Sequence, residues 1–121
     1  MRPLTLYGIP NCDTVKRARV WLVAQGLPHQ FHDFKKHGVP EAALRGWAQA
    51  LGWQPLLNRQ GTTWRKLTPE VQASVVDADS ALALLQAHSS VIKRPVVAWR
   101  NGAVTVGFDA VQCATLAADV P

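Results

Sequence analysis

Residues 4–22, LTLYGIPNCDTVKRARVWL, decide the fold expected for this chain. The apolar run over residues 4–7 predicts a buried strand, and the glycine and proline behind it predict that the strand leaves into a loop. Asn11 is a candidate helix cap, and the apolar side chains that follow, Val15, Ala18 and Leu22, fall on one helical face before Gly26 ends the pattern. Residues 29–34, HQFHDF, predict a second strand. The chain therefore opens with a strand–helix–strand unit, in which we expect parallel strands and a right-handed crossover.

The middle of the chain is predicted to be helical. Pro40 suits the first position of a helix, whereas residues 54–66 are rich in loop-forming residues. Thr68 is expected to cap a short helix, and either Asp77 or Asp79 to open another.

The last third of the chain predicts a hairpin and a helix. Residues 96–99 and 103–106 favour strands and flank Asn101-Gly102, the strongest short hairpin signal in a sequence. Residues 109–118 predict a final helix. This order of elements predicts an α/β fold of the thioredoxin-like kind, with a mixed four-stranded sheet and a helical insertion before its second half.

The composition indicates one globular domain. Of the 121 residues, 48% are hydrophobic and 17% are charged, which favours a packed core. The two cysteines are too few for a disulfide framework, and an unpaired thiol persists best in a reducing compartment, so we expect a cytoplasmic protein. No apolar run has the length of a membrane span, and the first eleven residues lack the apolar segment of a secretory signal.

The net charge of +5 favours anionic partners. Nucleic-acid binding would be better supported by a dense basic stripe with interleaved aromatic side chains, whereas the basic residues of this chain are scattered. We therefore expect a solvated basic surface with one site for a small anion, and neither nucleic acid nor a membrane as partner.

Cys12 is the candidate nucleophile. It follows the loop after the first strand and opens a helix, where unpaired backbone N–H groups and the helix dipole stabilise a thiolate. Lys16, one turn along, would add a favourable charge, while Asp13 opposes ionisation. The alternative, on position alone, is an inert cysteine that fills a tight turn.

Other candidate residues carry weaker signals. Val15 stands three residues after Cys12, so there is no Cys-x-x-Cys pair, and Cys113 is expected to be an inert core residue of the last helix. Pro95 reads either as a routine strand start or as a cis-proline, and Arg94 either as an anion ligand or as a solvated side chain.

The histidines do not predict a metal site. His29 and His32 are three residues apart on a predicted strand and therefore face opposite sides, and His37 and His88 lie elsewhere in the sequence.

Three motifs in this order resemble the ArsC-like family, which includes arsenate reductases and Spx regulators, and most of all its YffB branch. They are YGIPNCDTVKRA at residues 7–18, LLN with GTTWRKL within residues 56–67, and IKRPV at residues 92–96. The resemblance implies a single ArsC-like domain, with a thioredoxin-like core at about residues 1–36 and 90–121 and a helical insertion at about 37–89.

The resemblance also assigns roles to residues. It implies that Cys12 is the catalytic thiol, that Arg94 lines the anion site and that Pro95 is the cis-proline beside the thiol. Arg65, within GTTWRKL, is a further candidate for the substrate cleft.

The sequence departs from the arsenate reductases of this family at three places. Their active loop has the pattern His-x-x-x-Cys, and this chain has Gly8 at the position of that histidine. They also carry arginines where this chain has Asn58 and Gly107-Phe108. Fewer cationic donors weaken a clamp for a small oxyanion, because charge-assisted hydrogen bonds are the strong ones.

The leading hypothesis is a glutathione-dependent thiol reductase. Cys12 would be the nucleophile, Lys16 and Asn11 at the helix start would stabilise its thiolate, and Arg94 would hold an anionic substrate or a glutathione carboxylate. We expect glutathione as co-substrate, no bound cofactor, glutaredoxin as a candidate partner, and a monomer.

Two alternative functions remain. The first is arsenate reduction coupled to glutathione and glutaredoxin. The second is a non-enzymatic, Spx-like regulator that binds RNA polymerase, against which the missing Cys-x-x-Cys pair argues.

Overall fold

The computed structural model describes residues 4–118. The chain divides into two compact units, of which the first contains the residues up to 37 and those from 94 onward, and the second contains residues 38–93. No helix within the described residues is long and apolar enough to cross a membrane.

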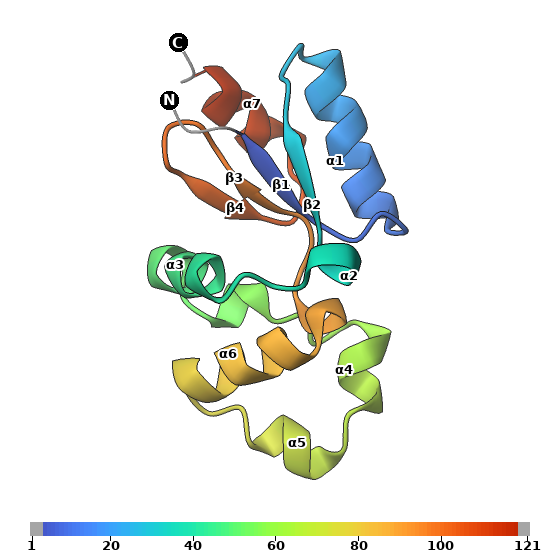
Figure 1. Cartoon of the computed structure of the whole chain (residues 1–121), viewed down its shortest axis with the longest axis vertical. Helices are drawn as coiled ribbons and strands as arrows, with labels where there is room; N and C mark the ends of the chain where they lie inside the picture. The colour runs from blue at the N-terminus through green and yellow to red at the C-terminus, as the bar shows by residue number, and fades with distance from the viewer. Residues whose placement is uncertain (1–3, 119–121) are drawn as a thin grey trace. The chain divides into compact units, whose positions relative to one another are not determined.

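The first unit is built on a four-stranded sheet with the strand order β2-β1-β3-β4 (Figure 1). β1 and β2 are parallel, whereas β3 is antiparallel to both β1 and β4. The mixed α/β sheet, the parallel opening and the hairpin are therefore confirmed. The strands are β1 (Thr5–Gly8), β2 (Gln30–Asp33), β3 (Val96–Ala98) and β4 (Val104–Val106).

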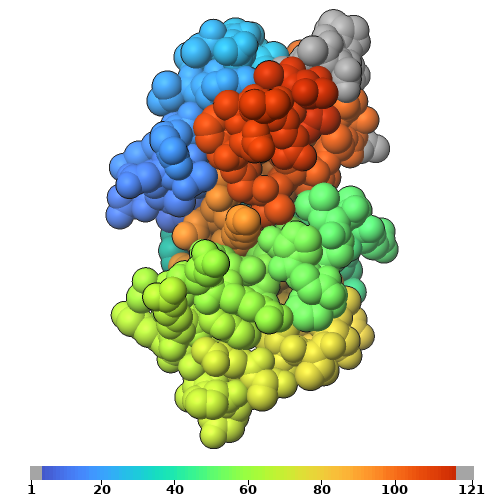
Figure 2. Space-filling view, turned by 180° about the vertical axis from the view of Figure 1, so that it is seen from behind, coloured from blue at the N-terminus to red at the C-terminus, as the bar shows by residue number. Residues whose placement is uncertain are grey.

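Two helices of this unit cover one side of the sheet. α1 (Asp13–Ala24) buries Val15, Ala18 and Leu22 at the helical spacing that the sequence predicted. These side chains form one core with the sheet and with α7 (Ala110–Ala118), and Figure 2 shows α1 in blue and α7 in red as neighbours. Burying a valine or leucine side chain contributes about 1.5–3 kcal/mol, so Val15 and Leu22 hold α1 against the sheet.

The ends of these elements differ from the prediction by one or two residues. The N-cap of α1 is Cys12, so the prediction that Asn11 caps the helix is wrong. Asn11 lies in the exposed loop before the cap, and the backbone turns into the helix one residue later. The second strand ends at Asp33, because a short helix, α2 (Phe34–His37), begins where strand was predicted to continue.

The second unit is helical. In α3, Leu44 and Trp47 are buried, and the helix starts one residue after Pro40, which is its N-cap. The loop prediction for residues 54–66 is wrong in part, because this segment contains one 3-10 turn and one short helix. The elements are α3 (Glu41–Leu51), η1 (Gln54–Leu56), α4 (Thr62–Lys66), α5 (Pro69–Ala73), α6 (Ala78–Ala87) and η2 (Ser89–Val91).

Side-chain caps begin two of these helices as the sequence predicted. The hydroxyl of Thr68 accepts a hydrogen bond of 3.2 Å from the backbone N–H of Val71. Asp77, rather than Asp79, caps α6, where its carboxylate accepts a bond of 2.9 Å from the backbone N–H of Ser80. The hydroxyl of Ser80 in turn accepts a bond of 3.1 Å from the backbone N–H of Asp77, which completes a capping box.

Candidate active site around Cys12

Cys12 lies between β1 and α1, as the N-cap residue of the helix. Its backbone is extended, with φ −138° and ψ 122°, and its carbonyl accepts the first helical bond, 2.9 Å long, from Lys16 N. The side chain is partly exposed, and it packs against the edge of the core beneath α1. A thiol at this place faces the unsatisfied amides of the first helical turn while remaining within reach of solvent.

The surroundings of Cys12 hold the pKa of its thiol below the ordinary value. Burial is the largest single influence and acts to raise the pKa. It is outweighed by the backbone N–H of Val15, by the hydrogen bond and charge of the Arg94 guanidinium, and by the backbone N–H of Thr14. The side chain of Cys12 makes no full cap hydrogen bond to the helix, and the donors near it lower its pKa because they stabilise a charged sulfur more than a neutral one.

The sheet topology explains how Arg94 reaches Cys12. β3 runs antiparallel to β1 with Val96 opposite Tyr7, near the end of β1 that leads into the Cys12 loop. Arg94 and Pro95 immediately precede β3, so they lie at this same end of the sheet. Arg94 is half-buried and Pro95 is buried.

The Arg94–Pro95 peptide bond is cis, which is the geometry that the resemblance implied. The carbonyl of Pro95 accepts a bond of 2.8 Å from Gly107 N, which ties the start of β3 to the residue that follows β4.

The two other residues proposed to stabilise the thiolate lie at the start of α1. Lys16 and Asn11 are both exposed. Lys16 lines a shallow hollow on the outer face of the helix together with Arg19, Val20, Val23 and His29. The donors that lower the Cys12 pKa are those of Thr14, Val15 and Arg94, so the roles of Lys16 and Asn11 stay predictions.

Arg65 is exposed in the last turn of α4, in the second unit. The aromatic side chain beside it in sequence, Trp64, is covered by the guanidinium of Arg59, with 5.8 Å between the Arg59 Cζ and the ring centroid. The assignment of Arg65 to the substrate cleft stays a prediction.

Cys113 is a core residue, as the sequence indicated. It is 3% exposed and belongs to the same core as Val15 and Leu22. Burial raises the pKa of its thiol, and Asp109 supplies both a backbone hydrogen bond that opposes this rise and a charge that adds to it. A protonated and enclosed thiol is a poor nucleophile, so Cys12 and Cys113 have opposite chemical characters.

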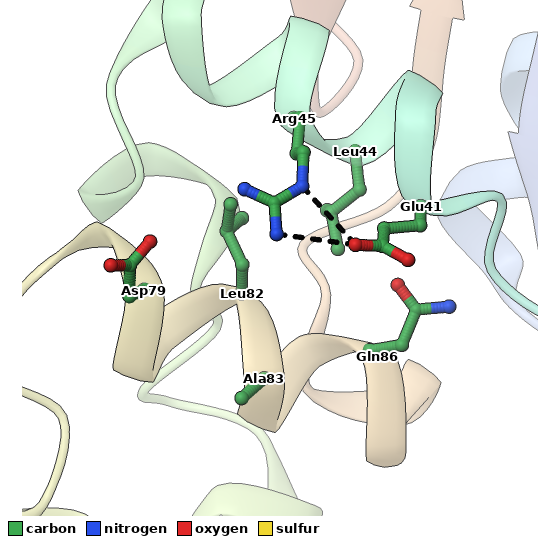
Figure 3. A pocket seen from close by; sticks show the side chains of 7 residues that line it. All are labelled: Glu41, Leu44, Arg45, Asp79, Leu82, Ala83 and Gln86. Atoms are coloured by element: carbon green, nitrogen blue, oxygen red, sulfur yellow. Dashed lines mark hydrogen bonds and ion pairs between the residues drawn. The ribbon is translucent and has the colours of Figure 1, made fainter.

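The second unit holds a hollow of about 410 Å³ between α3 and α6. Figure 3 shows it lined by Glu41, Leu44 and Arg45 from α3 and by Asp79, Leu82, Ala83 and Gln86 from α6. Within it Arg45 forms an ion pair of 3.1 Å with Glu41, both side chains being largely exposed. None of its lining residues is a cysteine, so it supplies no thiol for the chemistry considered at Cys12.

Sequence reasoning missed one group at the site and described another incompletely. Val15 was interpreted only as a core residue, although its place three residues after a helix cap marks its N–H as a donor to that cap. Arg94 was expected to bind an anion, and its contact with the sulfur follows from strand pairing that the sequence does not show directly.

Comparisons with known proteins relate most of this chain to one family. The ArsC family model matches residues 7–116. An uncharacterized protein of Haemophilus influenzae is 38% identical over 106 residues, which are 88% of this chain and 91% of the relative.

Two solved structures extend the likeness to the fold. The YffB protein is 42% identical with a TM-score of 0.88, over 93% of this chain and 97% of that one. An arsenate reductase (ArsC) related protein from Brucella melitensis is 45% identical with a TM-score of 0.72, over 94% of this chain and 93% of that one. The matched residues run from β1 to α7 and include both Cys12 and Arg94.

Proposed function

This chain belongs to the ArsC family and is related to arsenate reductases, and we propose that it is a glutathione-dependent thiol reductase that acts through the single thiol of Cys12. The observation that supports the proposal is the set of donors around that sulfur, two backbone amides and one guanidinium, which together outweigh the effect of burial on its pKa. The thiolate is the form that attacks disulfides, so a lowered pKa raises the reactive fraction at neutral pH.

The proposed reaction has two exchange steps. In the first, the Cys12 thiolate attacks the glutathione sulfur of a mixed disulfide between glutathione and a second thiol. The sulfur–sulfur bond breaks, the second thiol leaves as a thiolate and takes up a proton, and Cys12 is left joined to glutathione. In the second step, the thiolate of a free glutathione attacks the glutathione sulfur of this adduct, which releases oxidised glutathione and restores the Cys12 thiolate.

An external thiol is required for the second step. Position 15, where a dithiol reductase would carry its second cysteine, is a valine, and Cys113 is 3% exposed with a raised pKa. Arg94 would have two uses in this cycle. Its guanidinium favours the free thiolate, and it would bind a glutathione carboxylate by a charge-assisted hydrogen bond when the adduct forms.

The direct test is formation of the adduct. The protein is incubated with oxidised glutathione, and intact and peptide masses are measured for the unaltered chain, Cys12→Ser and Cys113→Ser. The unaltered chain and Cys113→Ser should each gain one glutathione on Cys12, and Cys12→Ser should gain none. Absence of the adduct from a folded, unaltered chain would refute the proposal.

Turnover is the second requirement. A glutathionylated peptide and free glutathione serve as substrates, and formation of oxidised glutathione is followed through glutathione reductase. The proposal requires a rate well above that of Cys12→Ser, and equal rates would refute it.

Arsenate reduction coupled to glutathione and glutaredoxin is a second candidate. It is favoured by the relation to arsenate reductases and by the Arg94 guanidinium, a donor suited to an oxyanion beside the thiol. Arsenate-dependent oxidation of glutathione in the presence of glutaredoxin measures this activity. A rate indistinguishable from that of Cys12→Ala would exclude it.

A further inference from the structure

Gly8, the last residue of β1, lies directly against the side chain of Val15 in the first turn of α1. A Cβ atom on Gly8 would stand 2.8 Å from Cγ2 of Val15 and 3.5 Å from its Cγ1. Ordinary contacts of this kind begin at 3.4 Å, so position 8 has no room for a side chain. Gly8 has no positive φ, and therefore close approach, rather than an unusual backbone conformation, is what requires glycine here.

Val15 has little freedom to move away from such a contact. Its side chain is fully buried, in the core that α1 shares with the sheet and α7. A β-branched residue in a helix has one strongly preferred rotamer, and its neighbours are close-packed. A Cβ at position 8 would therefore displace the first turn of α1, by roughly 0.6 Å if the 2.8 Å separation is to reach 3.4 Å.

The displaced turn carries the backbone N–H of Val15, one of the donors that lower the pKa of the Cys12 thiol. Cys12 is the N-cap, which makes Val15 the third helical residue, and the amide at that position is one that a cap side chain accepts from. The side chain of Val15 thus rests on Gly8 while its backbone N–H faces the sulfur. The two contacts belong to one residue and must move together.

We propose that Gly8 is a positioning residue for the thiol of Cys12, because its lack of a side chain lets Val15 pack against β1 and so sets the backbone N–H of Val15 at the sulfur. This inference rests on the proposed function, in which Cys12 reacts as a thiolate. It concerns only the ionisation of Cys12, so it can be tested without measuring turnover. The three atoms nearest to a Cβ at position 8 all belong to Val15, so Gly8 acts through Val15.

The test is the pH dependence of Cys12 alkylation by iodoacetamide in Gly8→Ala. We expect the midpoint to rise and the rate at pH 6 to fall about threefold or more, with a similar rate at high pH, where the thiol is fully ionised. Gly8→Ala/Val15→Ala is the matched rescue, because it removes both γ carbons that the new Cβ would meet and leaves the backbone amide in place. The rescue should bring the midpoint back to that of Val15→Ala alone.

Unfolding by urea separates this role from a merely structural one, since lower stability alone does not move the midpoint of a folded protein. If Gly8→Ala folds and its midpoint equals that of the unaltered chain, the inference is refuted. If Gly8→Ala does not fold, the comparison is made in the Val15→Ala background. There Gly8→Ala should leave the midpoint unchanged, and Gly8→Val, whose γ carbons restore the crowding, should raise it, and no rise would refute the inference.

The two proposals fail separately. A midpoint at the ordinary cysteine value in the unaltered chain contradicts the proposed function. A lowered midpoint that Gly8→Ala does not change contradicts only the role of Gly8.

Discussion

Replacing Arg94 with glutamine should slow alkylation of Cys12 at neutral pH by raising the pKa of its thiol. Arg94 favours the thiolate both through a hydrogen bond and through its charge. A hydrogen bond to a charged group contributes about 1.5–3 kcal/mol, but Cys12 is partly exposed, and solvent screening reduces the effect to about 1 kcal/mol. This free energy corresponds to about a fivefold lower thiolate fraction at pH values below the midpoints of both proteins.

The assay is the alkylation rate by iodoacetamide from pH 5 to pH 10, measured in the Cys113→Ser background so that one thiol reacts. Arg94→Lys is the matched control, because it keeps the positive charge and loses only the planar, forked arrangement of guanidinium N–H donors. Its midpoint should lie between those of the parent and of Arg94→Gln. Circular dichroism establishes that each variant is folded. The reasoning is refuted if Arg94→Gln, folded, has the same midpoint as the parent.

Three further predictions concern stability. Trp99→Phe removes the buried bond of 3.0 Å from the indole N–H to the Thr105 hydroxyl, and should lower the free energy of unfolding by about 1–3 kcal/mol in urea titrations, less in a Thr105→Val background. Burial raises the pKa of Cys113 in the folded state, so its contribution to stability is fully present below the pKa of the unfolded chain and is lost as pH rises through the folded pKa; in urea titrations the stability of the parent relative to Cys113→Ser should therefore fall as pH rises above about 8.5. Asp77→Ala should lower the melting temperature, because it removes the acceptor for the Ser80 amide, and this loss should shrink at acid pH as the lowered Asp77 pKa is reached.

Most of the fold could be predicted because its signals are local. The burial of Val15, Ala18 and Leu22 follows from their spacing on one helical face. The hairpin follows from an Asn-Gly pair between two strand-favouring runs, and it places Val104 opposite Ala98. In each case neighbouring residues in the sequence determine the element, so no knowledge of long-range contacts is needed.

The short helix α4 was not predicted, because it is too short to contain a full repeat of the apolar pattern of a helix. α4 has five residues, too few to repeat an apolar position, and its N-cap, Gly61, makes no side-chain bond that would mark the start. A Cβ on Gly61 would come within 2.7 Å of Nδ2 of Asn58, at the end of a flexible side chain. A contact of this kind gives no periodic pattern in the sequence that would indicate a helix start.

The candidate site was predictable to the extent that it depends on chain order. Cys12 could be selected because a strand, a turn and a helix start are contiguous in the sequence. The contact with Arg94 could be anticipated only through the family resemblance, because it depends on the pairing of β3 with β1, in which Val96 stands opposite Tyr7. The close approach of Val15 to Gly8 could not be predicted, because no neighbouring residue in the sequence indicates which side chain faces a glycine in a strand.

The opposing effects of burial and of hydrogen-bond donors on the Cys12 pKa explain why a helix start and an arginine occur together at one thiol. Burial of the sulfur opposes its ionisation and is the largest single influence on its pKa. Backbone amides alone supply only partial charges, and an arginine alone would be weakened by solvent at a partly exposed site. Acting together they exceed the effect of burial, and each is held by the same sheet, the amides through Gly8 and Val15 and the guanidinium through the start of β3. The reactivity of Cys12 is thus a property of how α1 and β3 meet the end of β1, which is why a substitution at a glycine of β1, whose added Cβ would meet Val15, is expected to change it.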